Sequence, residues 1–456
     1  LMANAGTINA SLIKKGIKIL KKNKKYDSAV TTSVYNMWSP IRARSLKKGS
    51  LVPFVSFKHM GGTKINCDRD AQGEVHYADM SASIVRPKCL ENLDKGLLPQ
   101  KWMGKKIAPI RNTAGFDIDF EWQLPQLKYW IKKYGSSLSS SRLVTGNLDK
   151  IEMIEKLISK NIKHENSIII GNGFLLNSTL IPCLTGNSLG KRNKCIIFSD
   201  KLNHASINYG CLISRQKCFR YNHLDLNHLE SQLKKTPNKM KKMIISETLF
   251  SMDGDLADLN GLRYLSKKYA CILYLDEAHS FGLYGKNGYG FASDVNKNTN
   301  EIIVGTFSKA IGSYGSFVSC SRDFYKKIVN SCGGLIYSTA LPPSILGAIS
   351  ASLKKITKAS KLRKKIKSNS EFLLENLKRL NFDTAKSNSH IIPLILRDRS
   401  KCESLKKYLF DQGYFVKEIS PPTVPSGYDR IRLSLTASMS RVIIKNFIKH
   451  ISNFKH

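Results

Sequence analysis

The sequence lacks three features that would each indicate a particular class of protein. No stretch approaches the roughly 18 to 20 consecutive apolar residues that a membrane span requires, and the longest apolar runs, such as residues 271–275, have the length of a strand. No two cysteines have the Cys-x-x-Cys spacing of zinc and iron–sulfur sites. Acidic residues are scarce, with 34 Asp and Glu against 73 Lys and Arg. We therefore exclude a transmembrane protein and expect no metal site.

The ten cysteines are scattered, and several lie within apolar runs, as Cys183 and Cys271 do. Because a free cysteine packs as a small apolar side chain, we expect buried thiols in a reducing compartment, which favours the cytoplasm. The first 26 residues contain no acid, and residues 11–22 have a helical repeat with a basic face. We expect a surface helix there, with a mitochondrial presequence as the alternative.

The net charge of +39 would attract any polyanion. A nucleic-acid-binding module, however, gathers its charge in one stripe with aromatic or helical readout elements. Here the lysines are spread over the chain, often as pairs such as Lys234-Lys235 and Lys354-Lys355. We interpret the charge as a composition bias on solvent-exposed faces. Steering of an anionic substrate or thioester is the second interpretation, and nucleic-acid binding is the third.

Short apolar runs alternate with helix-length segments between about residues 134 and 341. Apolar strands separated by helices indicate an α/β fold with a mostly parallel sheet covered on both faces. The predicted strands are residues 167–170, 195–198, 243–245, 271–275 and 302–304. We expect three parts: an N-terminal arm and divergent segment over residues 1–115, a large domain over 116–345 and a small α+β domain over 346–456.

Two strand ends in the predicted sheet carry residues suited to chemistry. Asp276 and His279 follow one strand, and Thr306 and Lys309 follow the next. Open α/β sheets bind ligands at the carboxyl ends of their strands. The 33 residues from Asp276 to Lys309 correspond to about one crossover unit, so we expect both groups to face one ligand.

Pyridoxal phosphate is a cofactor that needs these groups. It requires a lysine for a Schiff base, a carboxylate that keeps the pyridine nitrogen protonated and a donor toward the phenolic oxygen. Its phosphate requires hydroxyls and backbone N–H groups, which Thr306, Ser308 and the turn with Gly173 and Phe174 can supply. Each pattern is common by itself, so their order and spacing favour the cofactor.

The chain resembles the α-oxoamine synthases, which are pyridoxal-phosphate enzymes of fold type I. The resemblance covers residues 135–450 approximately and implies a mostly parallel central sheet with helices on both faces and a smaller C-terminal α+β domain. The matching segments are Ser141–Gly146, Gly173-Phe174 with Asn177, Ser199–Ser206, Phe250–Asp255, Asp276–His279, Gly305–Lys309, Ser338–Pro343 and the proline loop that leads to Arg430–Leu435.

The resemblance also implies roles for single residues. Lys309 would form the Schiff base and later act as acid and base at the substrate Cα, while Asp276 would pair with the pyridine nitrogen. His279 would face the phenolic oxygen, and His204 would stack on the ring. These four are the expected catalytic residues. The implied cofactor-binding residues are Gly173, Phe174, His204, Glu247, Ser251, Asp276, His279, Thr306, Ser308, Lys309 and Thr339.

Further expected contacts concern the substrates and a second subunit. Arg432 would bind the amino-acid carboxylate in a bidentate pair, and Asn177 belongs to the same substrate-binding set. Thr339 would reach the phosphate of a neighbouring site, because the family's sites lie at a homodimer interface. The implied substrates are a small amino acid and an acyl thioester, carried on coenzyme A or on a carrier protein.

The implied reaction is a decarboxylative condensation, which makes the chain a pyridoxal-phosphate-dependent acyltransferase. The proline loop and Ile336–Thr339 favour the branch that joins L-alanine to a pimeloyl thioester in biotin synthesis. Gly146–Lys150 resembles serine palmitoyltransferase, and the glycine-using 2-amino-3-ketobutyrate ligase and 5-aminolevulinate synthase share most of the core. An inactive partner subunit is the non-enzyme alternative, and Lys309 argues against it because such subunits typically lack this lysine.

The sequence departs from the family at several positions, which leaves the substrate open. Residues 112–117 are the nearest counterpart of an Asn-Tyr-Leu-Gly segment, and the serine-rich residues 136–140 replace a glycine-rich loop. Ile151, Tyr289 and Met439 replace a histidine, an arginine and a histidine.

Overall fold

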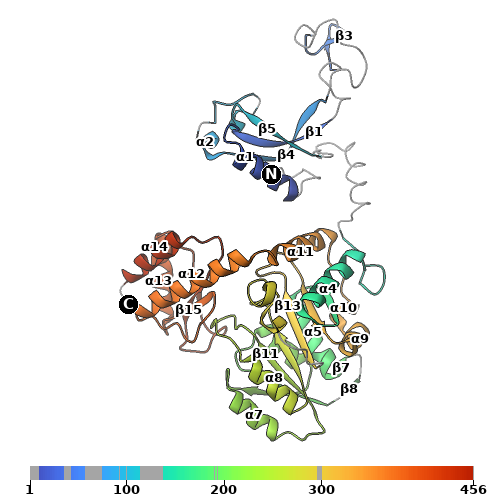
Figure 1. Ribbon diagram of the computed structural model, residues 1–456, viewed down its shortest axis with the longest axis vertical. Coiled ribbons are helices and arrows are strands. Elements are labelled where there is room, and N and C mark those ends of the chain that lie inside the picture. Colours follow the sequence, from blue (N-terminus) through green and yellow to red (C-terminus); the bar gives the residue numbers. More distant parts are fainter. Residues whose placement is uncertain are drawn as a thin grey trace. The chain divides into compact units, whose positions relative to one another are not determined.

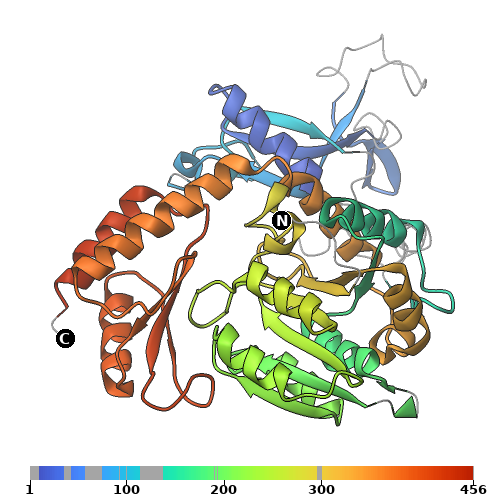
Figure 2. The same ribbon diagram turned by 60° about the horizontal axis from the view of Figure 1, so that its bottom comes forward.

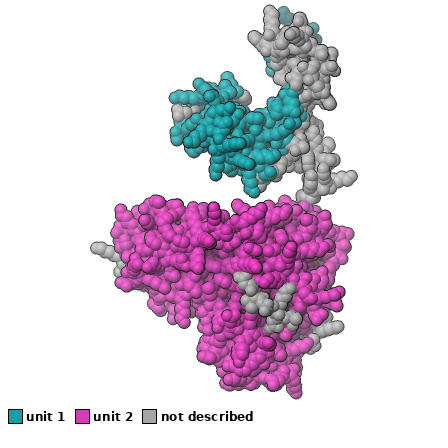
Figure 3. Space-filling view, viewed as in Figure 1, with its two compact units in different colours: residues 1–134 teal, residues 135–456 magenta. Residues whose placement is uncertain are grey.

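The computed structural model describes residues 10–34, 43–56, 74–91, 93–98, 100–112, 137–188, 191–192, 194–294 and 300–454 (Figure 1). Residues 113–117 and Ser136 of the segments named above lie outside this set, as does Cys67, one of the ten cysteines. Within the described residues, no helix has the length and apolar character needed to cross a bilayer. The chain divides into two compact units, residues 1–134 and 135–456 (Figure 3), and the three-part division stays a prediction.

Unit 1 is a small sheet covered by helix α1 (Ala10–Lys22). The sheet has the order β4-β1-β5, with β4 antiparallel and β5 parallel to the central strand. Its strands are β1 (Ser28–Val34), β4 (His76–Val85) and β5 (Ile107–Arg111). Leu12 and Leu20 of α1 are buried against this sheet, so the expected basic helix is present and packs within a folded unit.

Much of unit 1 coincides with the segment that the sequence presents as an arm. The pattern of apolar runs does not predict this sheet, because its central strand buries polar side chains. Thr31 is fully buried, and its hydroxyl donates to the carbonyl oxygen of Ala82. The unit also contains β2 (Arg44–Lys47), β3 (Ser50–Pro53), α2 (Pro87–Leu90) and the short helix η4 (Lys101–Met103).

Unit 2 contains a seven-stranded sheet of order β10-β9-β11-β12-β13-β14-β6. All neighbouring pairs are parallel except those of β14, which runs antiparallel to β13 and β6. The expected mostly parallel sheet is therefore confirmed. Its strands are β6 (Asn166–Ile170), β9 (Cys195–Asp200), β10 (Lys217–Tyr221), β11 (Lys241–Glu247), β12 (Cys271–Asp276), β13 (Glu301–Thr306) and β14 (Ser316–Cys320).

Alternate residues of these strands enter two cores, one on each face of the sheet, because successive side chains of a strand point to opposite faces. Leu273 and Phe198 belong to one core, and Tyr274 and Ile197 to the other. Each such large apolar side chain contributes about 1.5–3 kcal/mol when buried. The helices of this region are α4 (Asp149–Ile162), α5 (Gly173–Thr185), α6 (Ala205–Ile213), α7 (Leu226–Lys234), α8 (Leu259–Lys268), α9 (Arg322–Ser331) and α10 (Gly333–Ile336).

The C-terminal part of unit 2 is a small α+β domain, drawn in orange to red in Figures 1 and 2. Its antiparallel sheet has the order β15-β17-β16 and shares a core with the surrounding helices. The elements are α11 (Pro343–Ile356), α12 (Ser360–Arg379), β15 (Ile391–Ile395), α13 (Arg399–Asp411), β16 (Lys417–Ile419), β17 (Arg430–Ser434) and α14 (Arg441–Ser452).

Close contacts join this small domain to the large one. Nη1 of the buried Arg430 lies 2.7 Å from Oδ1 of Asp253 and also donates to the carbonyl oxygen of Met252. Gly254 has a φ of 71° and packs on the Ile391 carbonyl, where a Cβ atom would overlap that oxygen. Glycine is thus required there for both space and conformation.

The nine described cysteines are all free thiols, and all except Cys218 are buried. This agrees with their expected role as small apolar side chains. The compartment in which the protein works stays a prediction.

Candidate active site

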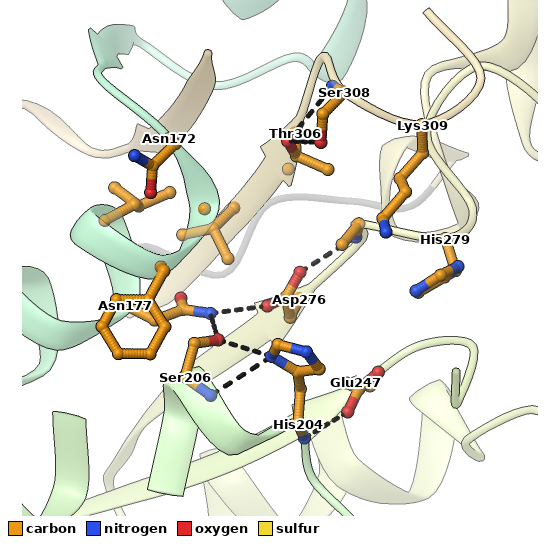
Figure 4. Close-up of a pocket in the computed structure, with 16 residues that line it drawn as sticks. Asn172, Asn177, His204, Ser206, Glu247, Asp276, His279, Thr306, Ser308 and Lys309 are labelled. Atoms are coloured by element: carbon orange, nitrogen blue, oxygen red, sulfur yellow. Dashed lines mark hydrogen bonds between the residues drawn. The ribbon is translucent and has the colours of Figure 1, made fainter. Parts of the chain in front are cut away.

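A cavity of about 240 Å³ lies at the carboxyl ends of β11, β12 and β13, beside the start of α5. Figure 4 shows side chains from all of these elements converging on it. Ten of the thirteen residues predicted as site residues line this cavity, which we call the cofactor cavity: Gly173, Phe174, Asn177, His204, Glu247, Asp276, His279, Thr306, Ser308 and Lys309.

The buried carboxyl group of Asp276 ends strand β12. Oδ2 accepts a hydrogen bond of 2.9 Å from Nδ2 of Asn177, and Oδ1 accepts one of 2.9 Å from the Ala278 backbone N–H. Burial raises the pKa of Asp276, and these hydrogen bonds oppose the increase. Among the described residues, no Lys, Arg or His side chain forms an ion pair with Asp276.

Asn177 is held in turn by two buried hydroxyl groups. Tyr274 Oη donates to Oδ1 of Asn177 over 2.5 Å, and Asn177 Nδ2 also donates to Ser206 Oγ over 2.9 Å. This network fixes the amide, so its donor faces Asp276. The sequence shows no signal for Tyr274, which lies within an apolar strand, whereas Ser206 follows His204 by two residues in a recognisable helix start.

His204 caps helix α6 and forms one wall of the cavity. Its Nδ1 lies 2.8 Å from Ser206 Oγ, and its backbone N–H donates to Oε1 of Glu247 over 2.5 Å. Burial raises the pKa of Glu247 well above its usual range, and the nearby charge of Asp276 raises it further. Both effects favour the neutral form of the Glu247 carboxyl group.

His279 and Lys309 lie on the side of the cavity opposite Asn177 in Figure 4. Burial lowers the pKa of His279 well below its usual value, and the positive charge of Lys309 lowers it further. His279 is therefore a neutral imidazole that can donate one hydrogen bond. Lys309 extends from the loop after β13 toward the space beside Asp276 and His279.

The first turn of α5 and the end of β13 form an anion-binding corner. Gly173 and Phe174 are the first two residues of the helix, so their backbone N–H groups have no partner within it. Asn172 caps the helix by accepting from the Leu175 N–H over 2.9 Å. Thr306 Oγ1 and Ser308 Oγ lie 2.8 Å apart across this corner. Asn172 belongs to the turn that the sequence indicates for phosphate binding, but it was not among the predicted site residues, although its place before the helix is typical of a cap.

Three predicted residues do not line the cofactor cavity: Ser251, Thr339 and Arg432. Arg432 lines a second cavity of about 570 Å³, which shares His279 and Lys309 with the first. Its Nε donates to the Ser251 carbonyl oxygen over 2.6 Å, and its Nη1 donates to Ser434 Oγ over 2.7 Å. Thr339 pairs with Ser141 in an isolated antiparallel bridge, so the contact predicted for it depends on a second subunit.

Comparisons with known proteins identify the relatives of this chain. Residues 117–451 match the aminotransferase class I and II family. A protein of Paramagnetospirillum magneticum is 39% identical over 68% of this chain and 78% of its own length, and one of Halalkalibacterium halodurans is 39% identical over 74% and 85%. Both bear the name "Putative 8-amino-7-oxononanoate synthase".

Solved structures point to the same family. Sphingomonas wittichii serine palmitoyltransferase is 26% identical with a TM-score of 0.66, over 71% of this chain and 81% of that one. Francisella tularensis 8-amino-7-oxononanoate synthase is 27% identical with a TM-score of 0.60, over 71% and 90%. A structure of serine palmitoyltransferase with pyridoxal phosphate as an internal aldimine is 27% identical with a TM-score of 0.66, over 71% of this chain and 81% of that one. This chain belongs to the α-oxoamine synthases. The expected family, fold type and class of enzyme are thereby confirmed.

The residues of this α-oxoamine synthase fit pyridoxal phosphate. The buried carboxyl group of Asp276 lacks a cationic partner within the described residues, and a ring N–H would supply one. The α5 N-terminus with Thr306 suits a phosphate, and Lys309 provides a primary amine in the same cavity. Dependence on pyridoxal phosphate therefore agrees with both the comparisons and the donor set.

Two departures from the family pattern lie in the apolar core of the synthase. Ile151 and Tyr289 are fully buried in the same apolar cluster and line neither cavity. Met439 packs against the core of the small domain. We conclude that the first two substitutions alter core packing, so neither places a new group beside a substrate.

Proposed function

We propose that this chain is an 8-amino-7-oxononanoate synthase, which condenses L-alanine with a pimeloyl thioester and releases CO₂. The observation that carries the proposal is the convergence of Lys309, Asp276 and His279 on one cavity, which shares Lys309 and His279 with the cavity that Arg432 lines. The choice of substrates rests on relatives of that name at 39% identity. The bound cofactor supplies an electron sink for the carbanion that forms at the amino-acid Cα.

The chain's own residues would hold and polarise the cofactor. Asp276 would accept the hydrogen bond of the ring nitrogen and keep that nitrogen protonated, because a buried negative charge favours the protonated ring. His279, as a neutral imidazole, would donate to the phenolic oxygen. The Gly173 and Phe174 N–H groups and the Thr306 hydroxyl would bind the phosphate.

The remaining roles concern the amino acid. Lys309 Nζ would attach the cofactor and then remove and return the Cα proton. Arg432 would bind the substrate carboxylate through Nη2, which faces no acceptor among the described residues. Its Nε and Nη1 already donate to Ser251 and Ser434. Those two bonds fix the plane of the guanidinium before the substrate arrives.

Serine palmitoyltransferase activity is the second candidate. It is supported by the TM-score of 0.66 to the Sphingomonas wittichii enzyme, against 0.60 to the Francisella tularensis oxononanoate synthase. The identities of 26% and 27% do not separate the two. The candidates differ in both substrates, so one assay distinguishes them.

The test combines each amino acid with each thioester. Purified holoprotein is incubated with alanine, serine or glycine and with pimeloyl, palmitoyl or acetyl thioesters on coenzyme A or on a carrier protein. Products and CO₂ are measured by mass spectrometry. Alanine with the pimeloyl thioester is expected to give the highest kcat/KM. Turnover confined to serine with the palmitoyl thioester would refute the proposal and establish the second candidate.

A further inference from the structure

The second cavity contains more positive charge than the amino-acid carboxylate needs. Its basic lining groups are Lys309, Arg432 from β17, and Lys355 and Arg363 from helices α11 and α12. None of its lining residues is an Asp or a Glu. Because Arg432 suffices for one carboxylate, the cations on α11 and α12 have no assigned partner in the proposed reaction.

Arg363 reaches this cavity from the first turn of α12. Its Nη1 donates to the carbonyl oxygen of Ile356, the last residue of α11. The same Nη1 lies 3.1 Å from the position that a Cβ would take at Gly288, next to the loop that contains Gly282. Arg363 and Arg432 thus approach the cavity from different elements, and each is oriented by a backbone carbonyl.

No acid neutralises Arg363 within the described residues. The acceptor for its guanidinium there is the Ile356 carbonyl oxygen, and none of the ion pairs among those residues includes Arg363. Burial lowers the pKa of Arg363. A partly buried guanidinium without a counter-charge is costly, and an anionic ligand would offset that cost.

The rest of the wall is largely aliphatic, which suits a hydrocarbon chain. These aliphatic residues come from the loop after β12, the loop after β13, α11, α12 and the position that follows β17: Leu283, Ala310, Ile311, Ile356, Leu362, Ile366 and Leu435. A cavity with basic groups from separate walls and aliphatic side chains around them fits an acyl chain with a carboxylate at its far end.

We propose that Arg363 binds a terminal carboxylate of the acyl chain and so selects thioesters derived from dicarboxylic acids. This inference rests on the proposed function and identifies the residue that would enforce it. A fatty acyl chain would instead place its methyl end against a charged guanidinium, which disfavours it. Lys355, exposed on α11, adds positive charge to the same wall.

A purely structural role for Arg363 predicts a different result. The bond to the Ile356 carbonyl caps the end of α11, as basic side chains often do. Loss of a cap would weaken binding of every acyl chain equally, whereas loss of a carboxylate ligand affects only chains that carry a carboxylate.

The experiment compares pimeloyl and heptanoyl thioesters, which have the same number of acyl carbons and differ in the terminal group. In Arg363→Met, kcat/KM with L-alanine and the pimeloyl thioester is expected to fall ~10- to 100-fold through KM, as expected for a lost charged hydrogen bond. The value for the heptanoyl thioester should change less than about threefold. Arg363→Lys should be intermediate. Lys364→Met removes a charge from the same helix outside the cavity and should match the wild type.

Equal losses for both thioesters, or no loss for either, would overturn the proposal. Binding of the pimeloyl and heptanoyl thioesters of coenzyme A to the holoprotein in the absence of amino acid, measured by calorimetry, gives a readout that needs no turnover. Tighter binding of the pimeloyl thioester that disappears in Arg363→Met and is partly kept in Arg363→Lys supports the carboxylate site even if the alanine reaction fails. If the wild type binds both thioesters alike, the carboxylate site is refuted, whatever the enzyme condenses.

Discussion

At the residue scale, the site depends on where single charges are buried. Asp276 and His279 lie at one strand end and Lys309 at the next, so the rule for ligand sites in open sheets finds them from the sequence. His204 and Arg432 carry no such local signal and were found through the resemblance alone. Tyr274 was missed because the sequence does not show the hydrogen-bond partner of its hydroxyl group. Without that partner, a tyrosine within an apolar strand is interpreted as a core residue.

We expect the negative charge of Asp276 to affect the catalytic rate more strongly than it affects binding of the cofactor. Asp276→Asn keeps the shape and removes the negative charge, so kcat should fall by about 10²- to 10³-fold, the typical effect of losing one electrostatic contact in an active site. Bound cofactor, measured by absorbance, should be largely retained because the phosphate contacts lie elsewhere. Asp276→Glu keeps the charge and serves as the control. Equal activity of Asp276→Asn and the wild type would contradict the role given to this carboxylate.

At the element scale, strand direction follows from the length of the connections. β13 ends at Thr306 and β14 begins at Ser316, which leaves too short a connection for a helical crossover, so β14 returns antiparallel. The short connection is visible in the sequence, but the prediction of the sheet considered only the alternation of apolar runs. The sheet of unit 1 was missed for another reason, since its central strand buries threonines and serines that read as polar.

Glu277 links the end of β12 to the segment that contains the short helices η6 (Lys286–Gly288) and η7 (Phe291–Asp294). Its fully buried carboxylate accepts from the Ala292 N–H over 2.6 Å and the Phe291 N–H over 3.1 Å, and also from Thr248 and Ser280. Glu277→Ala would leave these buried donors unpaired.

We expect Glu277→Ala to lower the free energy of unfolding by about 2–4 kcal/mol, since each unsatisfied buried donor costs about 1–3 kcal/mol. The melting temperature measured by calorimetry checks this. Glu403→Ala, at an exposed acid on α13, should leave it nearly unchanged. A Glu277→Ala protein as stable as the wild type would show that the segment does not need this carboxylate.

His223 ties three segments together through two acids. Nδ1 lies 2.8 Å from Asp200 and Nε2 lies 2.9 Å from Asp255. Burial lowers the pKa of His223, but the hydrogen bonds and charges of Asp200 and Asp255 outweigh burial and raise it to about 10. The folded state therefore binds this proton more tightly than the unfolded state, whose histidine has a pKa near 6.5.

The stabilisation from protonated His223 is fully present below about pH 6.5 and is lost as the pH rises toward about 10. Between pH 7 and pH 10 the melting temperature of the wild type should therefore decrease more than that of His223→Gln, which cannot titrate. Parallel pH profiles of the two proteins would contradict the assigned pairing. His228 →Gln, at a histidine without an acidic partner among the described residues, is the matched control.

At the scale of the whole molecule, the expected homodimer involves a second subunit, which the structure of one chain does not contain. Phe174 at the cofactor cavity is 52% exposed, and Tyr337, two residues before Thr339, is 73% exposed; exposed large apolar side chains are typical of an interface. Light scattering of the holoprotein should give twice the chain mass of 51.2 kDa. A monomer with full activity would contradict both the dimer and the role of Thr339 in a neighbouring site.

The covalent attachment of pyridoxal phosphate to Lys309 is the central claim, and borohydride reduction tests it most directly. The holoprotein is reduced, digested and analysed by peptide mass spectrometry, with Lys309→Ala as the control. We predict a pyridoxyl-phosphate mass increase on the peptide that contains Lys309 and no such peptide in the control. Reduction that leaves Lys309 unmodified, or places the adduct on another lysine, would contradict the account.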